Sequence, residues 1–305
     1  MSAISHNQHQ KPLLNLWGLA LLLILILTFQ LVGYFISLYA LSISFGIDIE
    51  EVKYLINAPD GSALGINIGR FSNLIQFILY MGVPALIFTA ANRVGVSFFG
   101  GYSKKLQFSK IVWSFLLAIS ALPLVAVLTK ISQHLPLPES LKLMADSLTT
   151  SREMLFENML EMHRWEELLF CIFLVALLPA LLEEYLFRGI VLNIALNQYA
   201  KPITAIIFQA VFFSLMHLSL YEFLGISLIG AVFGIITYRN QTVWYSTISH
   251  FVFNSTTVIL YYLILMKFEN SGVKYNPDQL LASASLAIPA SFIFGYSIYQ
   301  LTKKS

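Results

Sequence analysis

Long apolar runs separated by short polar segments dominate the chain. The first run extends from Leu13 to about Ile43 and is too long for the core of a signal peptide. Seven further runs follow, at about 72–92, 111–130, 168–198, 203–221, 224–238, 242–266 and 280–301. A helix needs about 20 apolar residues to cross a bilayer core of about 30 Å. The pattern therefore predicts an all-α polytopic membrane protein with about eight transmembrane helices.

The composition agrees with this pattern and excludes several classes of protein. Hydrophobic residues make up 57% of the 305 residues, charged residues make up 11%, and the mean hydropathy is +0.74. A soluble domain carries about 25% charged residues. A cytosolic enzyme, a coiled coil and a disordered tail are therefore excluded. The chain has one cysteine, Cys171, so no intrachain disulfide is possible and a secreted disulfide scaffold is excluded as well.

The charges outside the apolar runs separate into two groups. The two end segments and the even-numbered loops carry cations and no acid: Lys11, Arg93, Lys104, Lys105, Lys110, Lys201, Arg239, Lys303 and Lys304. The odd-numbered loops carry nearly all of the acidic residues. Because loops rich in lysine and arginine stay in the cytoplasm, we predict that both termini are cytoplasmic.

Three charged residues lie inside an apolar run. The run 168–198 contains Glu183, Glu184 and Arg188. One charge at the bilayer centre costs about 2.5–3.5 kcal/mol on insertion scales. Glu184 and Arg188 are four residues apart, so they can form a structural ion pair on one helix face. Glu183 has only apolar neighbours at that spacing, so we predict a partner on another helix and a functional role.

Other apolar runs offer polar partners for Glu183. His217 lies near the end of the run 203–221, and His250 lies in the run 242–266. Asn254 follows His250 by four residues, and Phe213 precedes His217 by four, so each pair shares a helix face. Taken singly, the histidines and the asparagine could form interhelical hydrogen bonds, and Phe213 could be core. Their depths along the helices allow them to converge with Glu183, which favours a common site.

A carboxylate that faces two imidazoles can bind and activate water. The carboxylate then acts as a general base, and the imidazoles and a nearby amide hold the water or stabilise an oxyanion. Glu183, His217 and His250 could instead bind a divalent metal such as zinc. Both arrangements favour hydrolysis of an acyl bond, and in a membrane the expected substrate is a peptide. The sequence contains no HExxH helix and no GxSxG elbow, and its aspartates lie in loops.

Three short segments contain these residues in a known order. They read EEYLFR from Glu183 to Arg188, FSLMH from Phe213 to His217, and HFVFN from His250 to Asn254. They resemble the EExxxR, FxxxH and HxxxN motifs of the CPBP family, which comprises CAAX proteases and bacteriocin-processing enzymes and is also called the Abi family. The three motifs together, each inside an apolar run, are far more specific than any one alone. The resemblance covers about residues 165–265.

The resemblance implies an intramembrane endopeptidase related to the enzyme that removes the last three residues of prenylated CAAX proteins. It implies that Glu183 activates water, that His217 positions this water, and that His250 with Asn254 forms the oxyanion side. It assigns supporting roles to Glu184, Arg188 and Phe213. Members are described both as glutamate-type proteases and as metalloproteases. We therefore expect a multi-pass protein of the bacterial plasma membrane that acts on a membrane-associated peptide or protein and does not bind nucleic acid.

The runs and motifs together predict the organisation of the chain. We expect three transmembrane helices in 1–130, an external loop in 131–167, a catalytic core of helices 4–7 in 168–266, and a last helix with a basic tail in 267–305. In the loop, Leu155, Met159 and Met162 would share one stripe of a surface helix, although a solvated connector fits as well. The alternatives to a protease are a non-catalytic immunity or scaffold protein and, less favoured, a proton-coupled transporter. A transporter should show internal pseudo-symmetry, which this sequence lacks.

Overall fold

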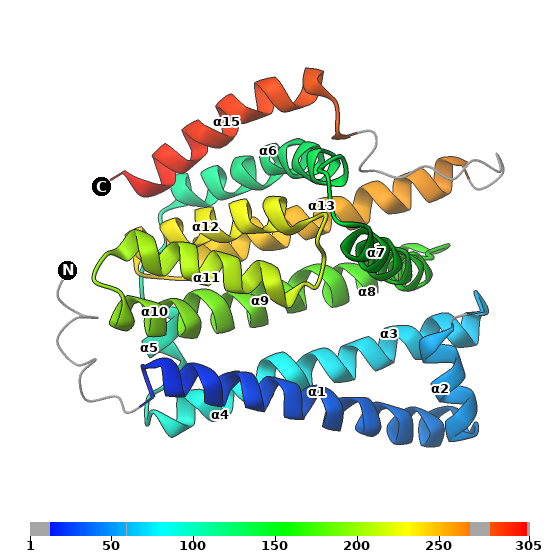
Figure 1. Cartoon of the computed structure of the whole chain (residues 1–305). Helices are drawn as coiled ribbons and strands as arrows, with labels where there is room; N and C mark the ends of the chain where they lie inside the picture. The colour runs from blue at the N-terminus through cyan, green and yellow to red at the C-terminus, as the bar shows by residue number, and fades with distance from the viewer. Residues whose placement is uncertain (1–12, 59, 269–280, 304–305) are drawn as a thin grey trace.

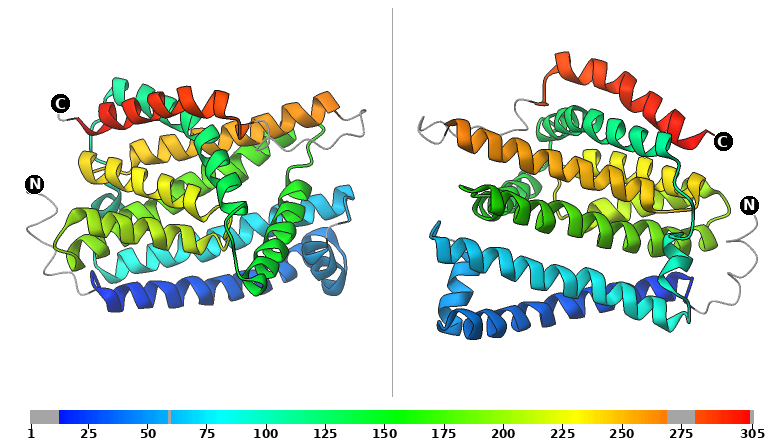
Figure 2. Two further views of the ribbon diagram at one scale, coloured as in Figure 1. Left: turned by 45° about the horizontal axis from the view of Figure 1, so that its top comes forward. Right: turned by 180° about the vertical axis from the view of Figure 1, so that it is seen from behind.

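A bundle of helices makes up the computed structural model, which describes residues 13–58, 60–268 and 281–303. No strand occurs in these residues, so the predicted all-α class is confirmed. In Figure 1 and Figure 2, an N-terminal helical hairpin forms one side of the bundle and α6 with α15 forms the opposite side. Helices α8 to α13 lie between these two sides. Helix α1 begins and α15 ends at the same end of the bundle (Figure 1).

The N-terminal hairpin consists of two long helical rods joined by a short helix. Its elements are α1 (Leu16–Phe45), α2 (Ile49–Asn57), α3 (Ala63–Phe77), the π-helix η2 (Ile78–Gly82) and α4 (Val83–Ala91). Helix α1 ends at Gly46, which has a φ of 68° that favours glycine. Helix α2 begins at Asp48, whose side chain accepts a hydrogen bond from the Glu50 backbone amide. These two caps place the turn between the rods.

One continuous helical rod contains the first motif. After α5 (Val96–Gly100), α6 (Phe108–Gln133) and α7 (Glu139–Met159), the rod comprises α8 (Trp165–Cys171), the π-helix η3 (Ile172–Leu177), α9 (Leu178–Glu183), the π-helix η4 (Glu184–Val191) and α10 (Leu192–Gln198). The two π segments were not predicted from the sequence. A π turn spaces its hydrogen bonds by five residues and is often found at functional sites. The segment η4 begins at the second glutamate of the first motif.

Four helices complete the bundle: α11 (Pro202–Met216), α12 (Phe223–Asn240), α13 (Trp244–Phe268) and α15 (Ala284–Thr302). Helix α11 packs along α12, α13 packs on α6 and on η3, and α15 packs on α6. The second motif therefore lies on α11 and the third on α13. Both helices border the rod that contains the first motif.

Six helices in the described residues are long and apolar enough to cross a membrane: Leu16–Phe45, Ala63–Ala91, Phe108–Gln133, Trp165–Gln198, Phe223–Asn240 and Trp244–Met266. They correspond to six of the predicted spans. The other two predicted spans contain α11, which has 15 residues, and α15, which has 19 residues. The six helices support an integral membrane protein. The count of eight spans and the cytoplasmic side of the termini stay predictions.

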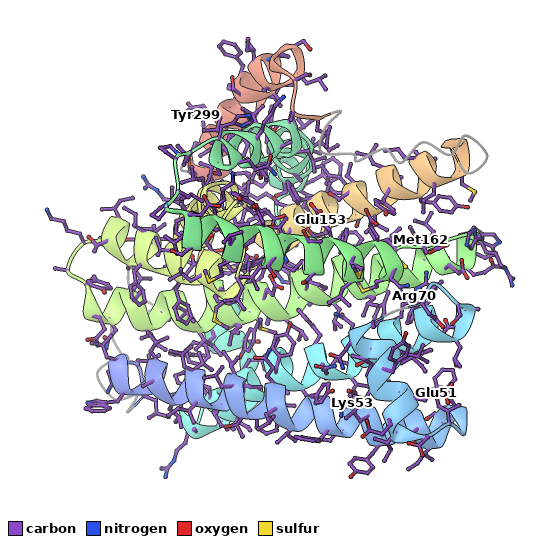
Figure 3. All side chains as sticks on the ribbon, turned by 45° about the vertical axis from the view of Figure 1, so that its right-hand side comes forward. Glu51, Lys53, Arg70, Glu153, Met162 and Tyr299 are labelled. Carbon is purple, nitrogen blue, oxygen red and sulfur yellow. The ribbon has the colours of Figure 1, made fainter. Side chains whose placement is uncertain are left out.

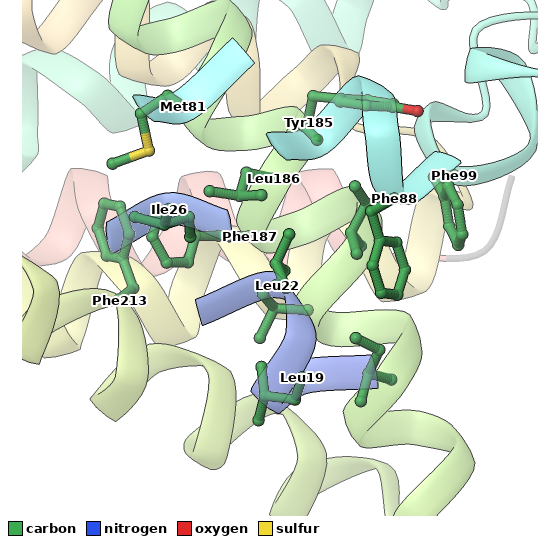
Figure 4. Packing of buried hydrophobic residues seen from close by; sticks show 14 of the residues in the cluster. Leu19, Leu22, Ile26, Met81, Phe88, Phe99, Tyr185, Leu186, Phe187 and Phe213 are labelled. Atoms are coloured by element: carbon green, nitrogen blue, oxygen red, sulfur yellow. The ribbon is translucent and has the colours of Figure 1, made fainter. Parts of the chain in front are cut away.

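A buried apolar cluster joins the N-terminal hairpin to the rod that contains the first motif (Figure 4). Leu22 and Ile26 of α1 and Met81 of η2 contribute from the hairpin, and Phe187 of η4 and Phe213 of α11 contribute from the other side. Each of these five side chains is at most 6% exposed. The hairpin therefore fixes the position of η4, although it contains none of the three motifs.

The segment predicted as an external loop forms the helix α7. This helix ends at Met159, so the predicted stripe that includes Met162 is wrong. Met162 lies beyond the helix and packs inside the protein, where it is fully buried beside Cys171. Arg70 of α3 holds the end of α7, because its Nε and Nη2 atoms donate hydrogen bonds to the Met159 and Glu161 carbonyls, at 2.9 and 2.7 Å. Figure 3 labels Arg70 and Met162 in this region.

Helices α11 and α12 approach closely at Gly230. A Cβ atom at this position would lie 3.1 Å from the Ala210 Cα atom of α11. We expect Gly230→Leu to lower the free energy of unfolding by about 1–3 kcal/mol, because added methylene groups would force the two backbones apart. Unfolding of the purified protein in detergent measures this change. Gly295→Leu on α15 is the matched control, because no atom lies within 4 Å of a Cβ there. Equal losses in the two variants would contradict the argument.

Candidate active site

Residues of all three motifs come together where η4, α11 and α13 meet. The Glu184 carboxylate is at the centre of this cluster. Its Oε1 atom accepts hydrogen bonds from Arg188 Nη1 at 2.8 Å and from His250 Nδ1 at 2.9 Å. The side chains of Glu184 and Arg188 are fully buried. The ion pair expected from their spacing is therefore present. The contact between Glu184 and His250 was not expected, because the sequence analysis paired His250 with Glu183 only.

Two aromatic rings surround the Arg188 guanidinium. Its Cζ atom lies 4.1 Å from the centroid of Phe213 and 5.3 Å from the centroid of Phe233. The Nε and Nη2 atoms of Arg188 have no hydrogen-bond partner among the described residues. A desolvated cation over an aromatic face gains about 2 kcal/mol or more, which offsets part of the desolvation of this charge. Phe233 was not predicted from the sequence because it lies on α12, outside the three motifs.

Glu183 approaches His250 from the neighbouring position on the rod. Its Oε2 atom lies 4.0 Å from His250 Nε2, and both side chains are 10% exposed. This distance is too long for a direct hydrogen bond. The Oε2 atom has no hydrogen-bond partner among the described residues. Glu184 Oε2 likewise has no hydrogen-bond partner among the described residues. The two glutamates differ because Glu184 is ion-paired with Arg188 through Oε1, whereas Glu183 forms no ion pair with an arginine or lysine among these residues.

The protonation of His250 follows from its partner. Glu184 is paired with Arg188, so its carboxylate is ionised and can only accept hydrogen bonds. In the neutral form of His250 the proton therefore lies on Nδ1, and the lone pair of Nε2 lies on the side of Glu183. A histidine held in one tautomer by a carboxylate, with its other nitrogen aimed at a second reactive group, is a common arrangement in hydrolases.

His217 borders this cluster through Phe213. It stands at the C-terminal cap of α11, and its Nδ1 atom lies 2.8 Å from the Phe213 carbonyl oxygen. A carbonyl oxygen only accepts, so Nδ1 carries the proton and Nε2 is an acceptor. The rings of His217 and Phe213 pack edge to face with centroids 4.6 Å apart. No hydrogen bond or ion pair among the described residues joins His217 to Glu183.

Asn254 connects α13 to the π-helix η3. Its Nδ2 atom donates a hydrogen bond to the Val175 carbonyl at 3.1 Å. This interhelical bond uses one of the two amide hydrogens. The side chain is therefore fixed one turn from His250, with its second hydrogen left to donate.

The ligand set that the sequence suggested for a metal is not gathered in this arrangement. No group of three histidine, cysteine, aspartate or glutamate side chains in the described part of the chain could hold a metal ion. His217 borders the cluster through Phe213 and forms no hydrogen bond or ion pair with Glu183 among the described residues. The residues present do not fit a zinc site with three protein ligands. We therefore derive the reaction from the groups of the chain alone.

Comparison with known proteins assigns the central part of the chain. Residues 165–256 match the family of type II CAAX prenyl endopeptidase Rce1-like proteins. No curated protein and no solved structure matches the chain. The matched segment starts with α8 and ends within α13, so it contains every residue of the three motifs. The resemblance that the motifs indicated is therefore confirmed, and residues 165–256 are identified as an Rce1-like segment of the CAAX protease (CPBP) family.

Proposed function

We propose that the protein is an intramembrane endopeptidase that hydrolyses peptide bonds of membrane-associated or CAAX-like substrates. The observation that carries this proposal is the approach of Glu183 and His250, in which the carboxylate Oε2 atom and the imidazole Nε2 atom lie 4.0 Å apart. The match of residues 165–256 to Rce1-like endopeptidases supports the same reaction. The six apolar helices support a substrate that reaches the site from the membrane.

The first step is activation of water. One water molecule can bond to two acceptors that are 4.0 Å apart, because each bond of about 2.8 Å spans part of the distance. Its two hydrogens then point to Glu183 Oε2 and His250 Nε2. Glu183 takes one proton as a general base, and the hydroxide attacks the scissile carbonyl carbon. His217 offers a third acceptor, Nε2, at the border of the site.

The second step is collapse of the tetrahedral intermediate. The carbonyl oxygen becomes an oxyanion, and the second amide hydrogen of Asn254, four residues after His250 on α13, can donate to it. Protonated Glu183 returns its proton to the leaving nitrogen as the carbon–nitrogen bond breaks. Glu183 is then ionised again, and the carboxylic acid product passes its remaining proton to the amine, so the final products are a carboxylate and an ammonium group. Glu184 and Arg188 act as positioning residues, because they hold the His250 ring and do not touch the substrate.

A non-catalytic scaffold is the second candidate. Asn254 forms an interhelical hydrogen bond, and Glu184 forms a buried pair with Arg188. Both interactions stabilise a bundle without any chemistry. The scaffold does not explain Glu183, whose buried carboxylate forms no ion pair with an arginine or lysine among the described residues. Burying a carboxylate without a compensating cation destabilises a fold, so the scaffold is the weaker proposal.

Cleavage of a prenylated peptide tests the proposed function directly. The full chain is reconstituted into liposomes and incubated with a farnesylated peptide that ends in a CAAX sequence, and with the same peptide without the prenyl group. Mass spectrometry then identifies the products. Release of the last three residues from the prenylated peptide is the expected result. If neither this peptide nor a transmembrane peptide is cleaved, the proposal of a non-catalytic scaffold is favoured instead.

Chelation separates the two types of protease. We expect that EDTA and 1,10-phenanthroline leave the cleavage rate unchanged, because the described residues do not gather three metal-binding side chains. The measurement is the initial rate before and after dialysis against chelator, together with metal analysis of the purified protein. Loss of cleavage that added zinc restores would contradict this and assign Glu183, His217 and His250 to a metal site.

A further inference from the structure

A basic pocket lies at the end of the bundle where α1 begins and α15 ends. We call this cavity the basic pocket. It has a volume of about 400 Å³, and five cationic side chains line it: Lys104, Lys105, Lys110, Arg239 and Lys303. No acidic side chain lines it. None of the residues that line the pocket belongs to the Glu183–His250 cluster.

The fold brings these cations together from distant parts of the sequence. Lys104 and Lys105 precede α6, and Lys110 lies in its first turn. Arg239 lies in the last turn of α12, and Lys303 caps the end of α15. Figure 1 shows that the start of α6 and the ends of α12 and α15 lie at the same end of the bundle. Two of these helices, α6 and α12, are candidate spans, so the pocket lies where helices leave the membrane.

The positive charges of the basic pocket have no acidic partner among the described residues. None of the ion pairs among the described residues includes a cation of the pocket. Lys110 is only 9% exposed, and its Nζ atom donates a hydrogen bond of 2.6 Å to the neutral Asn240 side chain. Lys303 is near enough to repel it electrostatically. Charges of one sign that converge without a counter-charge destabilise a fold, and a bound anion would relieve the repulsion.

The shape and chemistry of the pocket favour a phosphate group. Lysine and arginine side chains are the usual partners of phosphate oxygens. Helix α6 begins at the pocket, and its cap residue Gln107 makes no side-chain hydrogen bond to the first turn. The free amide groups of a helix start add to the attraction for an anion. Basic pockets between transmembrane helices, at the level of the bilayer surface, bind anionic lipid headgroups.

We propose that the basic pocket binds a phosphate group, and that in the membrane this phosphate belongs to the headgroup of an anionic phospholipid. The lipid would join α6, α12 and α15 at their ends. Asn240 and Tyr245 also line the pocket, and they stand on either side of the turn from α12 to α13. A bound lipid would therefore stabilise the two helices that contain Phe233 and His250.

A pair of matched variants tests the basic pocket. The double variant Lys104→Gln with Arg239→Gln removes two exposed cations that line the pocket. The control is the double variant Arg93→Gln with Lys201→Gln, which also removes two exposed cations. The separation of charges along the sequence predicts that both lie on the same side of the membrane as the pocket, and neither residue lines it. Because all four side chains are exposed, both variants should fold. Each protein in detergent receives phosphatidylglycerol, phosphatidylcholine with the same acyl chains, or inorganic phosphate.

Thermal unfolding and native mass spectrometry measure the result. We expect phosphatidylglycerol to raise the Tm of the wild type and of the control by roughly 5 °C, and phosphatidylcholine to leave it unchanged. The pocket variant should lose at least half of this shift and retain less bound phosphatidylglycerol. Equal losses in both double variants, or no preference for phosphatidylglycerol in the wild type, would overturn the proposal. If inorganic phosphate alone raised the Tm by the same amount, the proposal that the phosphate belongs to a lipid would be wrong.

Discussion

Glu183→Gln is expected to reduce peptide cleavage by about 10²–10⁴-fold, the range that general base catalysis contributes. Glutamine has the same shape as glutamate but cannot take the proton of water. The Glu183 side chain forms no hydrogen bond with its neighbours among the described residues, so the protein should stay folded. The measurement compares initial rates of cleavage and unfolding temperatures of the same purified samples. Glu153→Gln, on the exposed surface of α7, is the control for the loss of one carboxylate.

The length of the Glu183 side chain provides a second, independent test of the same role. Glu183→Asp keeps the charge but withdraws the carboxylate by one methylene group. A displacement of about 1 Å at a reacting group can reduce the rate by about 100-fold. A purely electrostatic role would tolerate this change much better. If cleavage survives Glu183→Gln, both the glutamate-type and the metal-dependent mechanism are wrong, and a scaffold whose polar cluster is structural remains.

The sequence was sufficient to predict the six long apolar helices and the charged and polar residues of the three motifs. Long apolar runs in the sequence indicate helices that face lipid or other helices. Charged residues inside such a run indicate positions that need a partner. The pair of Glu184 and Arg188 was predictable because both lie on one helix, where spacing determines distance. The contact of Glu184 with His250 could not be predicted in this way, because it depends on how two helices are rotated about their axes. The spacing of residues along the sequence gives no information about this rotation.

The π segments show a second limit of prediction from spacing. The helical repeat of 3.6 residues assigns Glu183 and Glu184 to adjacent faces of one regular helix. In the structure α9 ends at Glu183 and η4 begins at Glu184. The wider π turn changes which residues share a face beyond this point. Phe233 was missed for a different reason, since a phenylalanine in an apolar helix carries no signal of the cation it contacts. A search for an aromatic partner of Arg188 on the other helices would have given Phe233 only as one of many candidate aromatic residues.

Arg188→Leu is expected to destabilise the protein by about 3–5 kcal/mol, the usual effect of removing one partner of a buried ion pair. The change leaves the fully buried Glu184 carboxylate without its cationic partner Arg188, and it removes the cation from the faces of Phe213 and Phe233. The double change of Glu184→Gln with Arg188→Leu should be milder, because no uncompensated charge stays buried. Denaturant unfolding in detergent of the wild type, both single variants and the double variant gives the coupling energy.

The chain contains a matched control for this cycle. Arg152 and Glu222 form an ion pair of the same length, 2.8 Å, but their side chains are 43% and 37% exposed. Their coupling should be about 0–1 kcal/mol, because water screens an exposed pair and solvates each partner when it is alone. Equal coupling in the two cycles would show that burial of the Glu184–Arg188 pair has no energetic consequence, which would contradict the prediction.

Activity distinguishes the two roles of Glu184. The double variant that lacks both charges should recover much of its stability, but it should not recover cleavage. The glutamine that replaces Glu184 can still contact the ring of His250 but cannot hold the imidazole with an ionised carboxylate, so Nε2 is no longer presented to Glu183 in one fixed state. A variant that is stable but inactive would show that Glu184 orients His250 as well as neutralising Arg188. Recovery of both stability and cleavage would reduce Glu184 to a partner of Arg188 and leave His250 positioned by packing alone.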